Sequence, residues 1–392
     1  MSGRSANRLT GRAQQRSAAR TWCRAVAATL VTLFTAIIVS IIVIDPFQQY
    51  HLSTRFTPRF YSLHHRFINP GLAKHADYDT IATGSSIVEN TRDEWVEHYC
   101  GGKAVNLAMP AMSAYEQGLL LQTALRSRPV KRVLMTLDFN SFAGGVREHQ
   151  SVAGALPTYL FDRNPFNDLP YVLSWDVLEK AWRVLRGDRS ERFTTDPKAP
   201  WYWADQRHFD RVSAVRNLDP DNLNKAYAQP SRSLDGMAAS FDANLLPLLR
   251  AHPETHFDLI WPPYSILVWA DFVQRGQLEV SLAFKRLVFE QTRALANVSV
   301  VDFQPVAEIT HDLDLYADLY HYAPQINETI VRVTCAGGER VSAGTLDEGI
   351  ETLRRQALAA DPRRIVAEAL DAGAARALGG GAAPAVRPGA AR

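Results

Sequence analysis

The stretch DTIATGSSIVEN, residues 79–90, leads from a short apolar run through a turn of small residues into a helical pattern. An apolar run of this length, bounded by turn residues, is typical of a strand buried on both faces of a parallel sheet. Similar runs follow at 104–108, 130–137, 257–261 and 298–303. Helical patterns at 94–98 and 113–126 separate the first three runs. This alternation predicts an α/β fold, a three-layer sandwich around a parallel sheet.

The stretch from about 141 to 250 breaks this rhythm, because it is rich in Pro, Trp, Asp and Arg and shows no strand repeat. We interpret it as a large, mostly helical insertion, with helices at 174–187 and near 234–250. Insertions at the carboxyl ends of strands often form lids or substrate walls. Its tryptophans either stack on sugar rings or, more commonly, pack the insertion itself; they are Trp175, Trp182, Trp201 and Trp203.

The charge of the chain is unevenly distributed. The 392 residues are 46% hydrophobic, and 43 basic residues against 41 acidic ones give a net charge of +2. This composition excludes a disordered chain and a globally basic nucleic-acid-binding protein. Residues 1–24, however, contain six Arg and no acidic residue, which leaves a net charge of −4 for the remainder. We therefore interpret 1–24 as a basic cytoplasmic tail, separate from the rest of the protein.

A run of twenty uncharged residues, 25–44, follows the basic tail. As a helix it would span roughly 30 Å, the thickness of the hydrocarbon core of a bilayer. A buried core helix seldom runs so long without charge. A cleaved signal peptide has a shorter apolar region of about 7–15 residues and a small-residue cleavage site, whereas this run ends in Ile and Val. Because arginines stay on the cytoplasmic side, we predict a single-pass anchor with its N-terminus in the cytoplasm and the C-terminal body outside.

The segments beyond the anchor follow from composition. Residues 45–76 form a juxtamembrane connector with prolines that interrupt any long helix, at Pro46, Pro58 and Pro70. The α/β domain then extends over 77–371. The tail 372–392 consists mainly of Ala, Gly, Pro and Arg, a composition that predicts disorder.

The cysteines are too few for a metal-binding framework. There is no C-x-x-C or H-E-x-x-H pattern, so we predict no metal and no cofactor. Cys100 and Cys335 would lie in an oxidising compartment, where a disulfide and two unpaired buried thiols are both open readings. Cys23 lies on the cytoplasmic flank of the anchor.

Two motifs carry the chemistry. The first strand ends in Thr83-Gly84-Ser85-Ser86, and the carboxyl ends of parallel strands are where α/β folds place reactive groups. A plainer interpretation of the turn is a serine that caps the following helix. The second motif, Asp318-Leu-Tyr-His321, follows the last predicted strand. A nucleophilic serine needs a base, and the base needs a group that holds its tautomer.

With these motifs the chain resembles the SGNH hydrolase superfamily, in which the nucleophile follows the first strand in a Gly-Asp-Ser turn and an Asp-x-x-His pair lies near the end. Gly84-Ser85-Ser86 matches that turn with Ser in place of Asp. The resemblance implies that Ser86 is the nucleophile, His321 the base and Asp318 its orienting group. It extends over roughly 45–335, interrupted by the insertion.

The Gly-Ser-Ser variant with one N-terminal membrane helix is most similar to exported proteins that help acylate surface polymers, such as those of teichoic-acid D-alanylation and alginate O-acetylation. The resemblance also implies an oxyanion hole formed by the nucleophile's own N–H, a Gly after the second strand and an Asn after the third. Here Ser86 supplies the first donor. Ala111 replaces the Gly, and can donate unless the turn demands a positive φ. Asp138 replaces the Asn and cannot donate when ionised, which leaves Asn140 as a candidate.

We also expect Tyr264 and Tyr322 to line the substrate pocket, and we interpret His64, His65 and His98 as surface or packing residues. Glu89 has no partner visible in the sequence. The resulting expectation is a serine-dependent acyltransferase or esterase that acts on O-acyl groups, acetyl above all, of a surface or secreted polysaccharide. A multi-pass membrane acyltransferase is a candidate partner that supplies the acyl group. The alternative is a catalytically inactive scaffold or glycan-binding partner.

Overall fold

The computed structural model describes residues 3–148 and 156–378, and its central feature is a five-stranded sheet. All strand pairs are parallel, and the strand order is β2-β1-β3-β4-β5. The strands are β1 (Thr80–Thr83), β2 (Ala104–Asn106), β3 (Arg132–Thr136), β4 (His256–Trp261) and β5 (Val298–Asp302). Each predicted apolar run contains one of them, so the parallel α/β class is confirmed.

The sheet is apolar on both faces. Consecutive residues of β3, from Val133 to Met135, are buried, and so are Leu259 and Ile260 of β4. Side chains of neighbouring strand residues point to opposite faces, so a run buried at every position requires cover on both sides. This requirement explains why the strands appear as continuous apolar runs and not as alternating patterns.

The crossover helices cover the two faces separately. The chain moves from β1 to β2 through α3 (Asp93–Cys100), then reverses direction and passes through α4 (Ala114–Ser127) to β3. Because such crossovers are right-handed, α3 and α4 lie on opposite faces. Helix α13 (Pro324–Cys335) contacts α3, whereas α2 (His65–His75) and α8 (Leu234–Asn244) contact α4.

The remaining helices belong to the insertion and the C-terminal part. The insertion contains α5 (Leu169–Val172), α6 (Trp175–Leu185), α7 (Arg211–Val215), α8 and α9 (Leu246–Ala251). The predicted helices at 174–187 and near 234–250 are thereby confirmed. After β4 and β5 follow α10 (Ile266–Gln274), α11 (Leu278–Thr292), α12 (Ala307–Thr310), α14 (Ala343–Ala359) and α15 (Pro362–Leu378).

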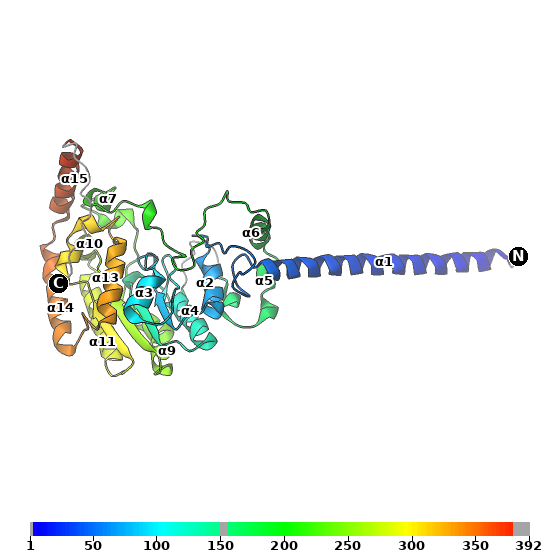
Figure 1. Cartoon of the computed structure of the whole chain (residues 1–392), viewed down its shortest axis with the longest axis horizontal. Helices are drawn as coiled ribbons and strands as arrows, with labels where there is room; N and C mark the ends of the chain where they lie inside the picture. Colours follow the sequence, from blue (N-terminus) through cyan, green and yellow to red (C-terminus); the bar gives the residue numbers. More distant parts are fainter. Residues whose placement is uncertain (1–2, 149–155, 379–392) are drawn as a thin grey trace.

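Helix α1 (Gly3–Ile44) projects from the domain, with its N-terminus far from the sheet (Figure 1). Its portion Ala18–Ile44 is long and apolar enough to cross a membrane, and few of these residues are buried. A signal sequence would meet the same criteria of length and composition. The arginine-rich residues from Gly3 onward continue the same helix.

Asp45 ties the end of α1 to the domain. Its carboxylate accepts hydrogen bonds from the N–H groups of Gln49 (2.9 Å), Tyr50 (2.6 Å) and His51 (2.9 Å). It also accepts one from the Tyr171 hydroxyl of α5 at 3.2 Å. Four acceptor contacts on one buried carboxylate hold the first turn after the helix in a single conformation.

The connector is an integral part of the domain through α2. Arg66 forms a buried ion pair with Glu116 of α4, with Nε 2.6 Å from Oε1. A Cβ atom at Gly71 would lie 2.1 Å from the Gln48 carbonyl oxygen, so the helix packs directly on the backbone of the connector. Pro70 lies inside α2 and does not end it.

The prediction of disorder from residue 372 is wrong for 372–378, because α15 continues to Leu378. The physical reason lies at Gly373, where a Cβ atom would lie 2.3 Å from a Val212 methyl group of α7. Small residues let two helices approach closely, so the Ala- and Gly-rich composition here serves packing. Residues 379–392 lie outside the described residues.

A disulfide joins Cys100 to Cys335, whose Cα atoms are 5.1 Å apart. It links the C-terminal ends of α3 and α13, two helices of the same face. Of the two readings left open by the sequence, the disulfide is the one that the structure contains. It closes a chain segment of 235 residues, so it restricts the unfolded chain strongly.

The paired substitution Cys100→Ala/Cys335→Ala should lower the free energy of unfolding by about 2–5 kcal/mol, because the unfolded chain regains the freedom that the crosslink removes. Urea denaturation of the detergent-solubilised chain measures this difference. Cys23→Ser, at an exposed free cysteine, is the matched control and should leave the stability unchanged. Equal stability of the paired variant and the parent would contradict the expectation.

Candidate active site

The turn after β1 places two serines at the carboxyl edge of the sheet. A Cβ atom at Gly84 would lie 2.0 Å from Thr136 Oγ1 and 2.7 Å from a Val88 methyl group, so only glycine fits beside the end of β3. The strand order places β1 and β3 side by side, and the chain leaves them in opposite directions. This is the switch point at which open α/β sheets bind ligands.

The capping interpretation of this turn is wrong. Helix α3 begins at Asp93, and the residue that precedes its first turn is Arg92. The residues between Ser86 and Asn90 form turns and no helix, so Ser86 neither caps a helix nor lies at the positive end of one. Its hydroxyl is therefore available for another partner.

That partner is His321, from a loop more than two hundred residues later in the chain. Ser86 Oγ lies 2.7 Å from His321 Nε2. On the other side of the ring, His321 Nδ1 lies 2.8 Å from Asp318 Oδ2 and 2.9 Å from Oδ1. The three predicted catalytic residues thus form one continuous chain of hydrogen bonds, the geometry of a nucleophile, a base and its orienting group.

The Asp318 carboxylate is itself held by the backbone. Its Oδ1 accepts the N–H groups of Tyr320 and His321, each at 2.9 Å. Burial raises the pKa of Asp318, but the charge of His321 and these hydrogen bonds outweigh burial and hold the pKa below its ordinary value. Asp318 is therefore ionised at neutral pH and stabilises a protonated imidazole.

The pKa of His321 moves in the opposite direction. Burial lowers it, but the adjacent Asp318 charge and hydrogen bond outweigh burial and raise the pKa above 6.5, with a smaller contribution from Glu89. A raised pKa makes His321 a stronger base.

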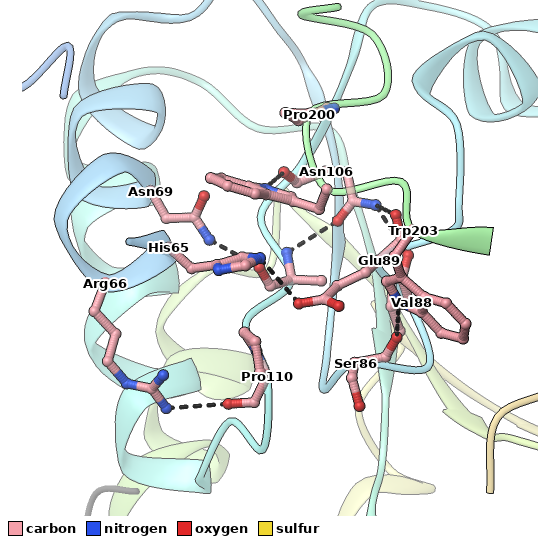
Figure 2. A network of polar contacts seen from close by, with 12 residues as sticks. His65, Arg66, Asn69, Ser86, Val88, Glu89, Asn106, Pro110, Pro200 and Trp203 are labelled. Carbon is pink, nitrogen blue, oxygen red and sulfur yellow. Dashed lines mark hydrogen bonds and ion pairs between the residues drawn. The ribbon is translucent and has the colours of Figure 1, made fainter. Parts of the chain in front are cut away.

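Two asparagine side chains hold the Ser86 turn, of which Figure 2 shows Asn106. Asn106, at the end of β2, donates from Nδ2 to the carbonyls of Val88 (2.9 Å) and Thr91 (2.8 Å). Asn327 of α13 donates to the Ile87 carbonyl at 2.8 Å. These bonds satisfy the backbone of a segment that has no secondary structure of its own.

Trp203 of the insertion contacts both Ser86 and His321. Its indole Nε1 donates to the Ser86 carbonyl at 3.3 Å (Figure 2). Its ring meets the His321 ring edge to face, with centroids 5.3 Å apart, and stacks on Phe209. Trp201 is buried and also lines the cavity, but no ring contact joins it to His321 among the described residues. The sequence left the role of these tryptophans open, and the structure assigns them different ones.

A second imidazole–carboxylate pair, His65 and Glu89, lines the same cavity as His321 and Asp318. His65 Nε2 lies 2.9 Å from Glu89 Oε1, and both side chains are buried (Figure 2). The Trp201 ring covers the His65 ring, with centroids 3.9 Å apart. The sequence provided no signal for this pair, because its members come from the connector and the Ser86 turn. His65 was expected to be a packing residue; the structure gives it a polar partner.

These groups line one cavity of about 340 Å³. Ser86, His321 and Asp318 lie in its wall with His65 and Glu89. The rest of the lining is aromatic or polar and includes Phe60, Ser62, Arg192, Phe193, Trp201, Tyr202, Trp203, Gln206 and Arg207. The insertion and the connector thus build most of the wall that faces the catalytic residues.

Of the three predicted oxyanion donors, only Ser86 lies in the cavity wall, whereas Ala111 is exposed and absent from the cavity lining. Among residues 3–148 and 156–378, no acceptor pairs with the N–H group of Ser86 or of Ala111. Ala111 has φ +49°, so the turn does demand the conformation that glycine adopts without strain, and Ala adopts it at a cost of about 1–2 kcal/mol. The Met109 N–H group donates to the Gly84 carbonyl at 3.1 Å, which holds the Ala111 loop against the Ser86 turn.

Asp138 acts as an acceptor and not as an oxyanion donor. Its Oδ2 accepts the Ser85 hydroxyl at 3.0 Å, and its Oδ1 accepts the Tyr264 hydroxyl at 2.7 Å and the Asn140 N–H group at 3.0 Å. The candidate Asn140 accepts a hydrogen bond at Oδ1 from Arg232 at 3.3 Å and is absent from the cavity lining described above. The structure therefore does not bring Asn140 to Ser86.

The expectation that Tyr264 and Tyr322 line the pocket is wrong. Tyr264 is fully buried, and burial with the neighbouring Asp138 charge raises the pKa of its hydroxyl well above the ordinary value. Tyr322 is also buried and lines a separate internal void of about 20 Å³. Tyr322 shares its void with residues of the sheet and of α13, whereas the Tyr264 ring packs against the rings of Phe139 and Tyr320.

Within the described part of the chain, no group of three or more His, Cys, Asp and Glu side chains is arranged to hold a metal ion.

The reactivity of Ser86 towards a fluorophosphonate should depend on pH through His321. Its raised pKa means that the neutral base prevails only above that value, so the labelling rate falls as pH falls through a midpoint above 6.5. Asp318→Asn removes the charge that raises the pKa. It should move the midpoint to lower pH and reduce the plateau rate by about 10²–10⁴-fold. A midpoint that Asp318→Asn leaves in place would contradict the assignment.

Comparison with known proteins identifies no family. No family model matches the chain, and no curated protein matches it. A solved structure described as "a putative platelet activating factor from Streptococcus pneumonia" is similar over 70% of this chain and 91% of that one, with 11% identity and a TM-score of 0.36. A similarity at this level carries no argument about function.

Proposed function

We propose that this protein is a membrane-anchored, serine-dependent acyltransferase or esterase that acts on O-acyl groups of a surface or secreted polysaccharide. One observation carries the proposal. Ser86, His321 and Asp318 are joined by contacts of 2.7 and 2.8 Å, and all three line one open cavity. Hydrogen bonding between a serine, a histidine and a carboxylate is the arrangement that activates a hydroxyl for attack on an ester.

The reaction follows from these contacts. His321 Nε2 accepts the proton of Ser86 as Oγ attacks the ester carbonyl, and Asp318 stabilises the imidazolium that forms. His321 then returns the proton to the leaving alcohol, which breaks the ester bond and leaves the acyl group on Ser86. In the second half, a hydroxyl of the acceptor or of water gives its proton to His321 and attacks the acyl group; the bond between the acyl carbon and Ser86 Oγ breaks, and His321 returns the proton to Oγ.

The oxyanion donors favour transfer over fast hydrolysis. Of the three expected oxyanion donors, the N–H group of Ser86 lies at the cavity, Ala111 has the strained φ of +49°, and Asp138 accepts three hydrogen bonds. The absence of one oxyanion donor lowers the catalytic rate constant by about 10²–10³-fold. An acceptor hydroxyl positioned in the cavity recovers part of this loss through orientation, which water does not.

The cavity lining supports a carbohydrate acceptor. Trp203 and Tyr202 offer aromatic faces, and Arg192, Arg207 and Glu89 offer charged groups that bind hydroxyls. A cavity that mixes apolar faces with a few polar groups fits a molecule with both kinds of surface. An acetyl group is our candidate for the acyl unit, and a multi-pass membrane acyltransferase for its source.

The arginine-rich start of α1 supports a cytoplasmic N-terminus, and the Cys100–Cys335 disulfide supports an oxidising compartment for the domain. We therefore place the catalytic domain in the periplasm of a bacterium, anchored in the inner membrane.

A catalytically inactive, glycan-binding scaffold is the second candidate. The observation that favours it is the pair of departures from the family's oxyanion hole, a strained Ala111 with φ +49° and the acceptor Asp138. The two functions differ in whether Ser86 reacts.

The purified full-length chain should be labelled by a fluorophosphonate at Ser86, and Ser86→Ala should abolish the labelling, because no other serine here is bonded to His321. Mass spectrometry of the labelled peptide checks the position. Ser62→Ala is the matched control, since Ser62 lines the same cavity, and it should be labelled like the parent. Absence of labelling in the parent, with the fold intact by circular dichroism, would favour the scaffold.

Transfer and hydrolysis should be separated by the products from an activated acetyl ester. With an acetyl-accepting oligosaccharide present, we expect acetylated sugar in excess of free acetate, and mass spectrometry measures both. Ser86→Ala should form neither above background. Free acetate alone, unaffected by any oligosaccharide tested, would identify an esterase instead.

A further inference from the structure

Helix α6 has a second apolar face that no part of the described chain covers. Its inner face, with Val177 and Ala181, is buried in the domain. Trp175, Trp182 and Leu185 are 80%, 59% and 52% exposed. Trp175, Trp182 and Leu185 are seven and three residues apart, so they form one stripe along the outer side of the helix.

The segment before α6 extends this stripe. Phe166 is 87% exposed, and Leu169 and Leu173 are each about half exposed. Scattered single apolar residues on a surface need no explanation, but a contiguous set of large ones marks an interaction site. We refer to Phe166, Leu169, Leu173 and the α6 stripe together as the α5–α6 surface.

The α5–α6 surface lies at the root of the membrane helix. Both α5 and α6 contact α1, and they lie at the end of the domain from which α1 leaves (Figure 1). The junction is well packed: Ile41 and Ile44 are buried in it, and Asp45 bonds to Tyr171 of α5 at 3.2 Å. The position of the surface relative to α1 is therefore determined by the fold.

The charges around the surface fit phospholipid headgroups. The guanidinium of Arg186 lies 5.6 Å from the centre of the Trp182 ring, whereas the neighbouring Arg183 pairs with Glu179 and Asp188. Tryptophan with arginine beside it is the composition of helices that lie in the interface of a bilayer, with the cations at the phosphates.

We propose that the α5–α6 surface is embedded in the interface of the same phospholipid bilayer that α1 crosses. A bilayer is favoured over a protein partner, because the apolar surface continues from the exposed side chains of α1 onto α5 and α6, and because arginines border it. The proposal rests on the anchoring of α1 and does not depend on acyl-transfer chemistry.

The consequence is a fixed orientation of the active-site cavity above the membrane. Asp176 of α6 pairs with His64 of the connector at 3.0 Å, and Lys180 pairs with Glu191 at 2.8 Å. The residue that follows Glu191, Arg192, lines the cavity. An embedded α6 would hold this wall of the cavity close to the lipid surface. A domain attached by α1 alone would have one contact with the membrane, which would not set the direction in which the cavity faces.

The test uses the full-length chain in lipid nanodiscs of phosphatidylethanolamine and phosphatidylglycerol. In a Cys23→Ser background, an environment-sensitive fluorophore is attached to Trp175→Cys or Trp182→Cys. Leu33→Cys, within α1, is the positive control, and Leu358→Cys, exposed on α14, is the negative one. The quenchers are lipids with a doxyl group either near the headgroup, for 175 and 182, or near the end of the acyl chain, for 33, and aqueous iodide. Thermal unfolding confirms that each variant is folded.

An apolar face in the interface lies about 5–10 Å below the headgroups, so lipid quenching should lower emission about twofold at 175 and 182. Iodide should have little effect there, and Leu358→Cys should show the reverse pattern. Lipid quenching at 33 but not at 175 and 182 would overturn the proposal while leaving the anchor intact. Protection from both quenchers at 175 and 182 would also overturn it, in favour of a protein contact. No lipid quenching at 33 would overturn the anchoring and the proposal together.

Discussion

The close approach of Gly84 to the end of β3 is the constraint on which the active site depends. With no Cβ atom at this position, the chain after β1 turns directly beside Thr136. Asp138 lies two residues beyond Thr136 and accepts a hydrogen bond from the hydroxyl of Ser85. Ser86, the residue after Ser85, lines the cavity. A larger residue at 84 would push the two strand ends apart, and with them the nucleophile and the loop that carries its base. The position of Ser86 is thus a consequence of strand packing.

Hydrogen bonds from other parts of the fold hold the Ser86 turn in its position beside His321. Asn106, Asn327 and Trp203 hold the Ser86 turn from three different elements, so the turn needs no helix to define it. Because these groups come from the sheet, from α13 and from the insertion, the turn is ordered only when all three layers of contact are in place. The insertion is therefore part of the catalytic architecture.

Hydrogen bonds and ion pairs also connect the end of the membrane helix to the domain. Asp45 joins the apolar helix to α5 through hydrogen bonds, and α6 joins the connector through His64 and Asp176. The connector in turn supplies His65 to the pair with Glu89 beside the catalytic residues. A continuous series of packed and bonded elements thus extends from the end of α1 to the cavity. Our two proposals, the acyl-transfer chemistry and the embedded α5–α6 surface, concern opposite ends of this series.

Local pattern determined the strands, the apolar helix and the identity of the three residues that the fold brings into one hydrogen-bonded chain, because buried strands need continuous apolar runs and a Ser-His-Asp arrangement needs particular side chains in particular motifs. The disulfide, the His65–Glu89 pair and the role of Trp203 join segments far apart in the chain, and no local spacing encodes such contacts. The same limit explains the errors at Tyr264, Tyr322 and 372–378. Proximity to a site in sequence says nothing about which way an aromatic ring points, and small residues look alike in a flexible tail and in a close helix contact. Only the packing of the whole chain decided between these outcomes, since burial and pairing are properties of neighbours in space.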